Sequence, residues 1–206
     1  MSRWDWIWPV LERPDDEHLV REGQRLQQDL DSVRSAKFDD DIDVLLAEAR
    51  RLFDAEGERR KGADTRATGY LTVVGVLITL LAAVAPVALG PTKDISKTLV
   101  TLALFAAAAS YLFGGAIWAF RTLRVAISHR LDVNDLIEIW ATPARKTDLV
   151  KGILACVRYE RRVVNEKISF IKMTHAFGLR AVAVFLIAIV VRTAWDPVAV
   201  LWKLAH

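Results

Sequence analysis

The side chains that could perform catalysis or bind a metal are few in this sequence, and they are widely spaced. The acidic run 39–43 has the composition of a calcium loop but lacks the glycine and the terminal glutamate that such a loop needs, so we interpret it as a helix start. No glycine-rich phosphate loop, Gly-x-Ser-x-Gly or His-Glu-x-x-His motif occurs. The four histidines match no metal-site spacing: His18, His129, His175 and His206.

A single cysteine, Cys156, excludes an internal disulfide and a multi-cysteine metal site. We expect it to pack on a helix face. Together with the missing motifs, this predicts a protein that is not an enzyme and that binds no cofactor and no metal.

Two long apolar segments are the main structural elements that would position any functional residues. Segments 67–89 and 98–120 each contain 23 residues without Asp, Glu, Lys, Arg or His. A helix of this length extends about 34 Å, enough to cross a hydrocarbon core of about 30 Å. The sequence therefore predicts a transmembrane hairpin over 67–120.

A third apolar segment, 181–191, is shorter and is flanked by Arg180 and Arg192. Arginine side chains can run along a helix and reach the headgroups, which extends the span to 177–195. We predict a third transmembrane helix and a short outer tail within 177–206, with a buried or re-entrant helix as the alternative.

Residues suited to membrane interfaces flank these spans. Tryptophan prefers the headgroup layer, and arginine can set the depth of a span. The candidate interface anchors are Trp118, Arg180, Arg192, Trp195 and Trp202.

Small residues recur every four positions in the first two spans, and such stripes let helices approach closely in lipid. The alternatives are ordinary hairpin packing inside one subunit and packing between subunits of a homo-oligomer. The helix-packing candidates are Gly75, Thr79, Ala83, Ala106, Ser110 and Gly114.

The first two spans contain no ionisable side chain. Proton pumps and many ion-coupled carriers need such groups within the membrane. This argues against a proton-coupled carrier and leaves a passive pore open.

The distribution of Lys and Arg predicts the orientation. The short loop 90–97 has a net charge of +1, whereas the flanks before the first span and after the second are rich in Arg and Lys. By the positive-inside rule, the N-terminus and 121–176 lie in the cytoplasm and the C-terminus lies outside, in a bacterial inner membrane. The basic residues before the third span then favour contact with anionic lipid, and we expect no nucleic acid partner.

The two polar regions carry opposite charge. Region 1–66 has a net charge of −5, and region 121–177 has a net charge of +5. Two alternatives follow: the regions pack together or attract neighbouring subunits, or both are simply solvated.

Helical patterns are expected in both polar regions. A charged helix is predicted over 15–35, and a second one from Ile42, with an apolar stripe at three- and four-residue spacing. No proline lies between Pro14 and Pro86, so this helix can continue through its glycines into the first span, each glycine weakening it by about 1 kcal/mol.

Two helix starts are predicted after the second span. Asp132 is the expected cap of a short helix, and Thr142-Pro143 the expected start of a long helix that reaches about Ala194. Asp196-Pro197 is expected to end it, with a short interfacial helix over 197–204.

Three tryptophans alternate at the N-terminus: Trp4, Trp6 and Trp8. Such a tip suits the headgroup layer of the inner leaflet, and docking onto the cytoplasmic helices is the alternative.

Two stretches carry a resemblance to a known group of proteins. They are Ala47-Glu48-Ala49-Arg50 through Arg66-Ala67-Thr68-Gly69-Tyr70 before the first span, and Tyr159 to Lys167 with its Asn-x-Lys, followed by Ala176, before the third. Over about two-thirds of its length the chain resembles small prokaryotic membrane effectors of the SLATT and Pycsar type. That resemblance implies charged helices before a transmembrane hairpin and a role in nucleotide-signalled anti-phage defence. The group usually has two spans, whereas this chain has three and carries no separate cyclic-nucleotide-binding domain.

The sequence thus predicts an all-α membrane protein with three transmembrane helices and a cytoplasmic helical layer. Its regions are 1–66, charged and cytoplasmic; 67–120, the hairpin; 121–176, cytoplasmic; and 177–206, the third span. The first functional hypothesis is a homo-oligomeric effector that permeabilises the lipid bilayer, with a cytoplasmic protein or a nucleotide as trigger. The second is a non-conducting anchor or scaffold, and the third is a subunit of a transporter or enzyme complex.

Overall fold

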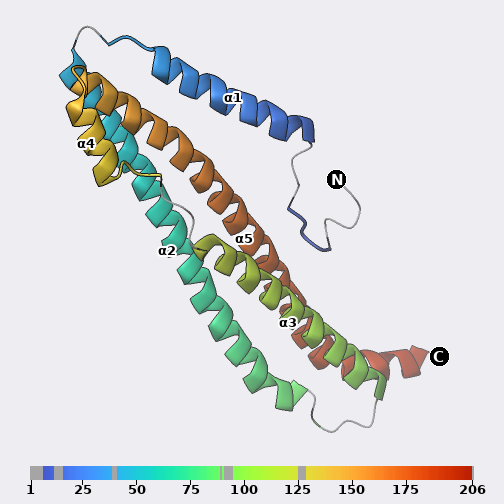
Figure 1. Cartoon of the computed structure of the whole chain (residues 1–206). Helices are drawn as coiled ribbons and strands as arrows, with labels where there is room; N and C mark the ends of the chain where they lie inside the picture. Colours follow the sequence, from blue (N-terminus) through green and yellow to red (C-terminus); the bar gives the residue numbers. More distant parts are fainter. Residues whose placement is uncertain are drawn as a thin grey trace. The chain divides into compact units, whose positions relative to one another are not determined.

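The structure is a computed structural model, and it describes residues 7–11, 16–38, 41–88, 90, 95–124 and 129–205. No strand occurs in these ranges, which confirms the all-α prediction. The helices within the described ranges are α1 (Asp16–Ser35), α2 (Ile42–Ala88), α3 (Ile95–Leu123), α4 (Val133–Ala141) and α5 (Arg145–Ala205) (Figure 1).

Three of these described helices are long and apolar enough to cross a membrane. The segments are Ile42–Pro86 in α2, Ile95–Leu123 in α3 and Arg145–Trp195 in α5. By length and composition, the three predicted spans are confirmed. The short apolar stretch before Arg192 is therefore part of one long helix.

Helix α2 is continuous through Gly57 and Gly62, as predicted. It begins after Asp41, whose φ of 53° is in the left-handed region that a short polar side chain tolerates. The carbonyl of Asp41 accepts the N–H of Leu45 at 3.1 Å, the first helical hydrogen bond of α2. The charged and apolar parts of α2 consequently share one continuous backbone.

The predicted cap of α4 is confirmed. Asp132 Oδ1 accepts the N–H of Val133 at 2.7 Å, and Asp135 Oδ2 accepts the N–H of Asp132 at 2.8 Å, which completes a capping box. The predicted start of the next helix at Thr142 is wrong. Thr142 ends α4, because its hydroxyl donates back to the Ile139 carbonyl at 2.8 Å, and α5 begins at Arg145.

The predicted helix end at Asp196-Pro197 is also wrong. The backbone of α5 remains helical to Ala205. A proline removes one backbone donor, and membrane helices tolerate that loss where neighbouring groups satisfy the freed carbonyl. Helix α2 likewise contains Pro86.

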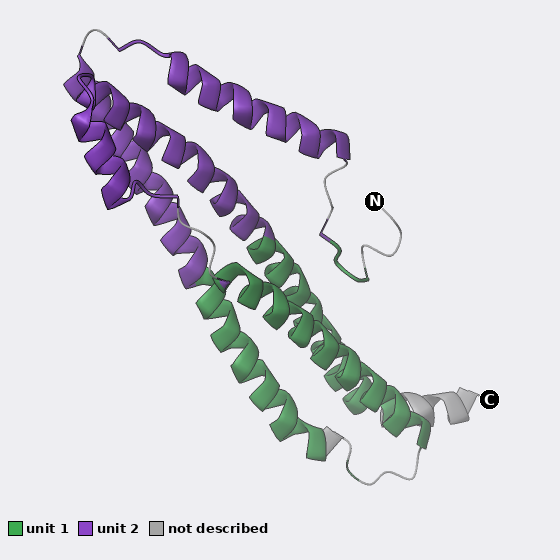
Figure 2. Ribbon diagram, in the orientation of Figure 1, with its two compact units in different colours: residues 1–10, 66–123, 170–206 green, residues 11–65, 124–169 purple. Residues whose placement is uncertain are grey.

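The chain divides into two compact units (Figure 2). Unit 1 comprises residues 1–10, 66–123 and 170–206, and unit 2 comprises residues 11–65 and 124–169. Unit 1 therefore contains α3 and the C-terminal parts of α2 and α5, whereas unit 2 contains α1, α4 and the N-terminal parts of α2 and α5.

The core of unit 1 forms along one face of α3. Leu112 packs with Val74 of α2 and Ala181 of α5. Phe105 packs with Ala188 of α5, and its ring meets Phe185 edge-on with ring centroids 5.9 Å apart. The three spans are thus joined by contacts between small and large apolar side chains.

The core of unit 2 follows a seven-residue repeat. In α2 the buried positions include Ala49, Glu56 and Ala63, and in α5 they include Val157 and Val164. A seven-residue repeat of buried positions is typical of the seam of a coiled coil, in which two helices pack side by side. The glutamate in this otherwise apolar set leads to the polar contacts described next.

Candidate functional site

A set of ion pairs joins α2 to α5 inside unit 2. We call this set the ion-paired seam. Its members are Glu56, Arg59, Arg60 and Asp64 of α2, and Glu160, Arg161, Asn165 and Lys167 of α5.

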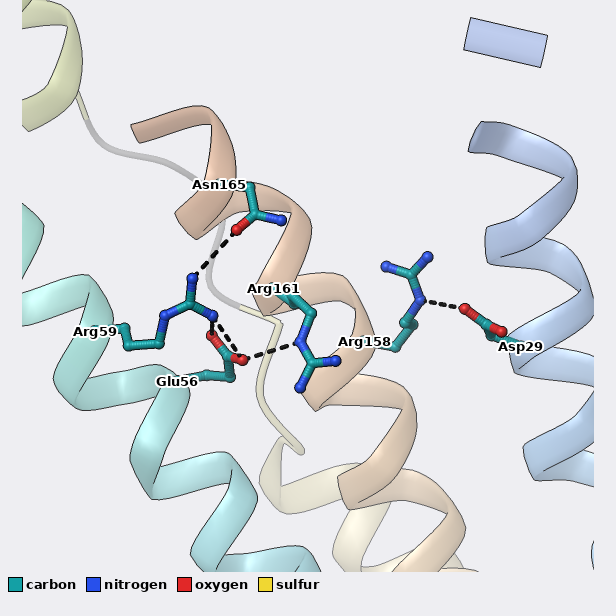
Figure 3. A network of polar contacts seen from close by, with 6 residues as sticks. All are labelled: Asp29, Glu56, Arg59, Arg158, Arg161 and Asn165. Carbon is teal, nitrogen blue, oxygen red and sulfur yellow. Dashed lines mark hydrogen bonds and ion pairs between the residues drawn. The ribbon is translucent and has the colours of Figure 1, made fainter. Parts of the chain in front are cut away.

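The carboxylate of Glu56 is at the centre of one half of the seam (Figure 3). It accepts hydrogen bonds from Arg59 at 2.8 Å on its own helix and from Arg161 of α5 at 3.0 Å. Arg59 also donates to the side-chain oxygen of Asn165 at 3.3 Å. Because Glu56 is only 5% exposed, these guanidinium groups supply the compensation that a buried charge requires.

The carboxylate of Glu160 forms the other half and is 6% exposed. Arg60 of α2 donates to it at 3.1 Å, and the backbone N–H of His129 donates to it at 2.7 Å. Glu160 therefore connects α2, α5 and the segment that precedes α4. Removal of this one carboxylate would leave a mostly buried guanidinium without its partner in the pair.

Further ion pairs extend the contact. Lys167, itself buried, pairs with Asp64. Lys146 pairs with Asp43 at 2.7 Å, and both side chains are largely exposed.

Helix α1 is joined to α5 through two contacts. Arg158 pairs with Asp29 of α1 at 2.6 Å (Figure 3). Lys151 donates to the carbonyl of Arg34 at 2.7 Å.

These contacts decide between the two alternatives for the oppositely charged regions. Segments 11–65 and 124–169 pack together, with carboxylates of the first segment paired to cations of the second. In one further pair the charges are exchanged: Arg60 is in the first segment and Glu160 in the second. The interpretation that both regions are simply solvated is wrong. The sequence hint was a charged residue within an apolar heptad pattern, at Glu56 and at Glu160.

In unit 1, Gly114 is the one predicted packing residue that is buried within the described chain. A Cβ at Gly114 would lie 2.7 Å from two ring carbons of Phe177 of α5, so only glycine fits beneath this ring. Phe177 is 2% exposed. This close approach of α3 and α5 was not identified from the sequence, although the glycine was.

The other helix-packing candidates lie on exposed faces. A Cβ added at Gly75 would meet no packed neighbour within 4 Å, and the hydroxyl of Thr79 donates to the Gly75 carbonyl at 3.0 Å. The hydroxyl of Ser110 donates to the Ala106 carbonyl at 2.8 Å. The exposed candidates are Gly75, Thr79, Ala83, Ala106 and Ser110. For these residues, hairpin packing inside one subunit and packing between subunits both stay predictions.

The interface-anchor candidates are half-buried where their side chains are described. Trp118 packs on Phe170 with ring centroids 5.5 Å apart, and the Arg121 guanidinium lies 4.7 Å above its ring. Arg180 donates to the Ala176 carbonyl at 2.9 Å, as expected of an arginine that runs along its helix.

At the far end of α5, Nη1 of Arg192 is buried and has no hydrogen-bond partner among the described residues. Trp195 is half-buried, and the side chain of Trp202 lies outside the described residues. The role of these residues at a membrane interface stays a prediction.

A recess of about 400 Å³ in unit 2 is lined by α4, α5 and the segment before α4. His129 stacks on Tyr159 at its wall, with ring centroids 4.8 Å apart. Cys156 also lines it, and burial, followed by the nearby carboxylates of Asp135 and Glu160, raises the pKa of the Cys156 thiol. No cluster of three metal-ligating side chains occurs in the part of the chain that the structure describes.

Comparison with known proteins yields no match to a family model, a curated protein or a solved structure.

Proposed function

We propose that the chain is a homo-oligomeric effector that permeabilises a bacterial inner membrane, and that unit 2 controls this activity from the cytoplasm. One observation carries the proposal: α2 and α5 are each one continuous helix that includes residues of the ion-paired seam and an apolar segment long enough to span a membrane. Because α2 and α5 are each continuous, the same two helices contribute to the seam and to the spans. A change in the seam can therefore bias the spans between two arrangements.

The low burial of the spans supports an oligomer. Within one chain, 11% of the most apolar 18-residue stretch of α2 is buried, against 39% of the corresponding stretch of α3. Helix α2 consequently offers most of its apolar surface to lipid or to further copies, and its small residues Gly75, Thr79 and Ala83 lie on exposed positions. Close packing of such residues is a common way for helices to associate in lipid.

The remaining parts of the proposal rest on the sequence. The excess of Lys and Arg before the first span and after the second supports a cytoplasmic N-terminus. The lack of ionisable residues in the first two spans suits a gate that closes by dewetting. The anti-phage setting, with a cytoplasmic protein or a nucleotide as trigger, rests on the resemblance to SLATT and Pycsar effectors.

The test is the membrane potential of bacteria that express the chain, followed with a voltage-sensitive dye. We expect the full chain to depolarise the cells once triggered, and a truncated chain that ends at residue 176 to leave the potential unchanged. Glu160→Gln weakens the seam and should depolarise the cells without a trigger. Its matched control is Glu58→Gln, because Glu58 is exposed and pairs with Lys61 on its own helix.

Equal potentials for Glu160→Gln, Glu58→Gln and the empty vector, at equal amounts of protein in the membrane, would refute control by the seam. Absence of depolarisation even with every candidate trigger would refute the effector function itself.

A non-conducting scaffold is the second candidate, and α4 favours it. Val133, Leu136, Ile137 and Trp140 follow helical spacing and are all exposed. An apolar helix face of this kind is a common recognition surface for protein partners. If the chain is a scaffold, we expect Ile137→Asp to abolish recovery of a protein partner on affinity purification. The membrane potential should then stay unchanged in all variants.

A further inference from the structure

The segment just before unit 2 begins, residues 7–10, packs on the membrane helices of unit 1. Tyr111 of α3 donates its hydroxyl to the Ile7 carbonyl at 2.7 Å. The Trp8 ring stacks on Tyr111 with ring centroids 5.7 Å apart, and it meets Phe177 of α5 edge-on at 5.1 Å. Pro9 is buried. The N-terminal segment thus touches two helices at once.

The contact falls where Phe177 of α5 packs closely over Gly114 of α3. The Phe177 ring that meets Trp8 is the ring that covers Gly114. Tyr111 and Phe177 also contact each other, with ring centroids 6.2 Å apart. Trp8 therefore closes a three-ring cluster over the α3–α5 contact, and its removal would expose one side of Phe177.

The same segment continues along the chain toward α1, which α5 holds through Arg158–Asp29 and Lys151–Arg34 in unit 2. The sequence alternative of docking onto the cytoplasmic helices is wrong for Trp8, because its ring packs on Tyr111 and Phe177 of unit 1. Contact with the headgroup layer stays a prediction, and Trp4 and Trp6 lie outside the described residues.

We propose that residues 7–10 are a clamp that holds α3 and α5 in the closed arrangement of the membrane unit. Docked, Trp8 keeps Phe177 seated on Gly114; released, it lets the two helices separate. The regulatory half of this inference rests on the proposed function, whereas the docking itself does not.

The experiment measures docking and activity on the same full-length protein. Spin labels at Val10→Cys and Phe120→Cys, both exposed positions of unit 1, report the distance by pulsed electron paramagnetic resonance in a Cys156→Ala background. Trp8→Ala removes both ring contacts and should raise the ratio of undocked to docked chains at least tenfold. Tyr111→Phe removes one hydrogen bond and should raise it about fivefold. Phe113→Ala, which removes an exposed aromatic ring of α3, is the matched control.

We expect a narrow distance distribution and no untriggered depolarisation for the parent and for Phe113→Ala. For Trp8→Ala we expect a broad distribution together with depolarisation. A narrow distribution in Trp8→Ala would overturn the docking contact. A broad distribution without added depolarisation, while Glu160→Gln does depolarise, would overturn the clamp as a control element and leave the proposed function standing. If no variant depolarises, the proposed function and the regulatory half fail together, and the narrow parent distribution still supports docking.

Discussion

Helices α2 and α5 pack against each other in both units, but with different side chains at the contact. In unit 2 the contact includes Glu56–Arg161 and Arg60–Glu160, with both carboxylates buried. In unit 1 it includes a hydrogen bond between the Tyr70 hydroxyl and His175 Nδ1 at 3.0 Å, and Val74 and Ala181 share one apolar cluster with Leu112 of α3. The same two helices thus use ion pairs in one unit, and apolar residues with one Tyr–His hydrogen bond in the other.

The difference matches the surroundings that suit each unit, which are water for unit 2 and lipid for unit 1. In water, two amphipathic helices associate readily, and charged residues within the seam restrict them to one register, since any shift separates the pairs. In lipid, burial of apolar surface no longer favours association, so close packing must hold the helices together. Variants of each unit can test whether this division is real.

The largest effect is expected for loss of the carboxylate of Glu160 from unit 2. Glu160→Ala removes the buried carboxylate that accepts from Arg60, whose side chain is 20% exposed, and from the His129 N–H. Loss of one member of a buried pair costs about 3 kcal/mol. Hydrogen exchange of segment 145–169 in detergent should accelerate accordingly, whereas exchange in Glu58→Ala should match the parent. Unchanged exchange in Glu160→Ala would mean that apolar contacts alone hold unit 2.

Unit 1 should be most sensitive to added volume. Gly114→Leu forces the buried Phe177 ring to move, which should cost about 2 kcal/mol and lower the midpoint of thermal unfolding in detergent. Gly75→Leu meets no packed neighbour within 4 Å and should leave that midpoint nearly unchanged. If the exposed face of α2 packs between subunits, Gly75→Leu alone should reduce the oligomer mass found by light scattering. Equal midpoints for the two variants would contradict the separation of buried and exposed glycines.

The burial of Cys156 inside unit 2 can be tested through the reactivity of its thiol. Burial raises the pKa of this thiol, so less thiolate exists at neutral pH. Iodoacetamide should therefore alkylate Cys156 more slowly than the exposed thiol of Val44→Cys in a Cys156→Ala background. The alkylation rate of Cys156 should also rise with pH over a higher pH range than the rate of the exposed thiol. Equal rates and equal pH profiles would indicate that water enters the α4–α5 contact.

The smallest effect is expected at the exposed edge of the seam. Lys146→Gln removes the pair with Asp43, in which both side chains are more than half exposed, so stability should change by about 0.5 kcal/mol or less. The same hydrogen-exchange measurement in high salt should erase even that difference. A change comparable to that of Glu160→Ala would remove the distinction between buried and exposed pairs.

The sequence predicted the helices well because their causes are local. Charge-free segments of about 20 residues and an uninterrupted helical stripe from Ile42 are visible without any knowledge of packing. The errors at Thr142 and Pro197 are local too. A threonine can cap the helix before it as well as the one after it, and a proline alone does not end a membrane helix.

Packing was predicted less completely, because it depends on which faces meet. Summed charges made packing of the two polar regions one of two alternatives, and they did not tell that Glu56 and Glu160 would be the buried members. A spacing of four marks a helix face without telling whether that face is covered, so Gly75 and Gly114 looked alike although one is open and the other lies under Phe177.

The pairs of the seam join residues that are far apart along the chain. The separations are 100 residues for Arg60–Glu160, 105 for Glu56–Arg161 and 103 for Asp64–Lys167. Both segments of the hairpin lie between the partners, so a ribosome completes them before it synthesises the second half of any pair. We expect the nascent chain to insert its hairpin while the charged part of α2 is hydrated and not yet paired with α5. Closure of unit 2 would then be a late step in biogenesis, and it would occur only on chains whose third helix has been made.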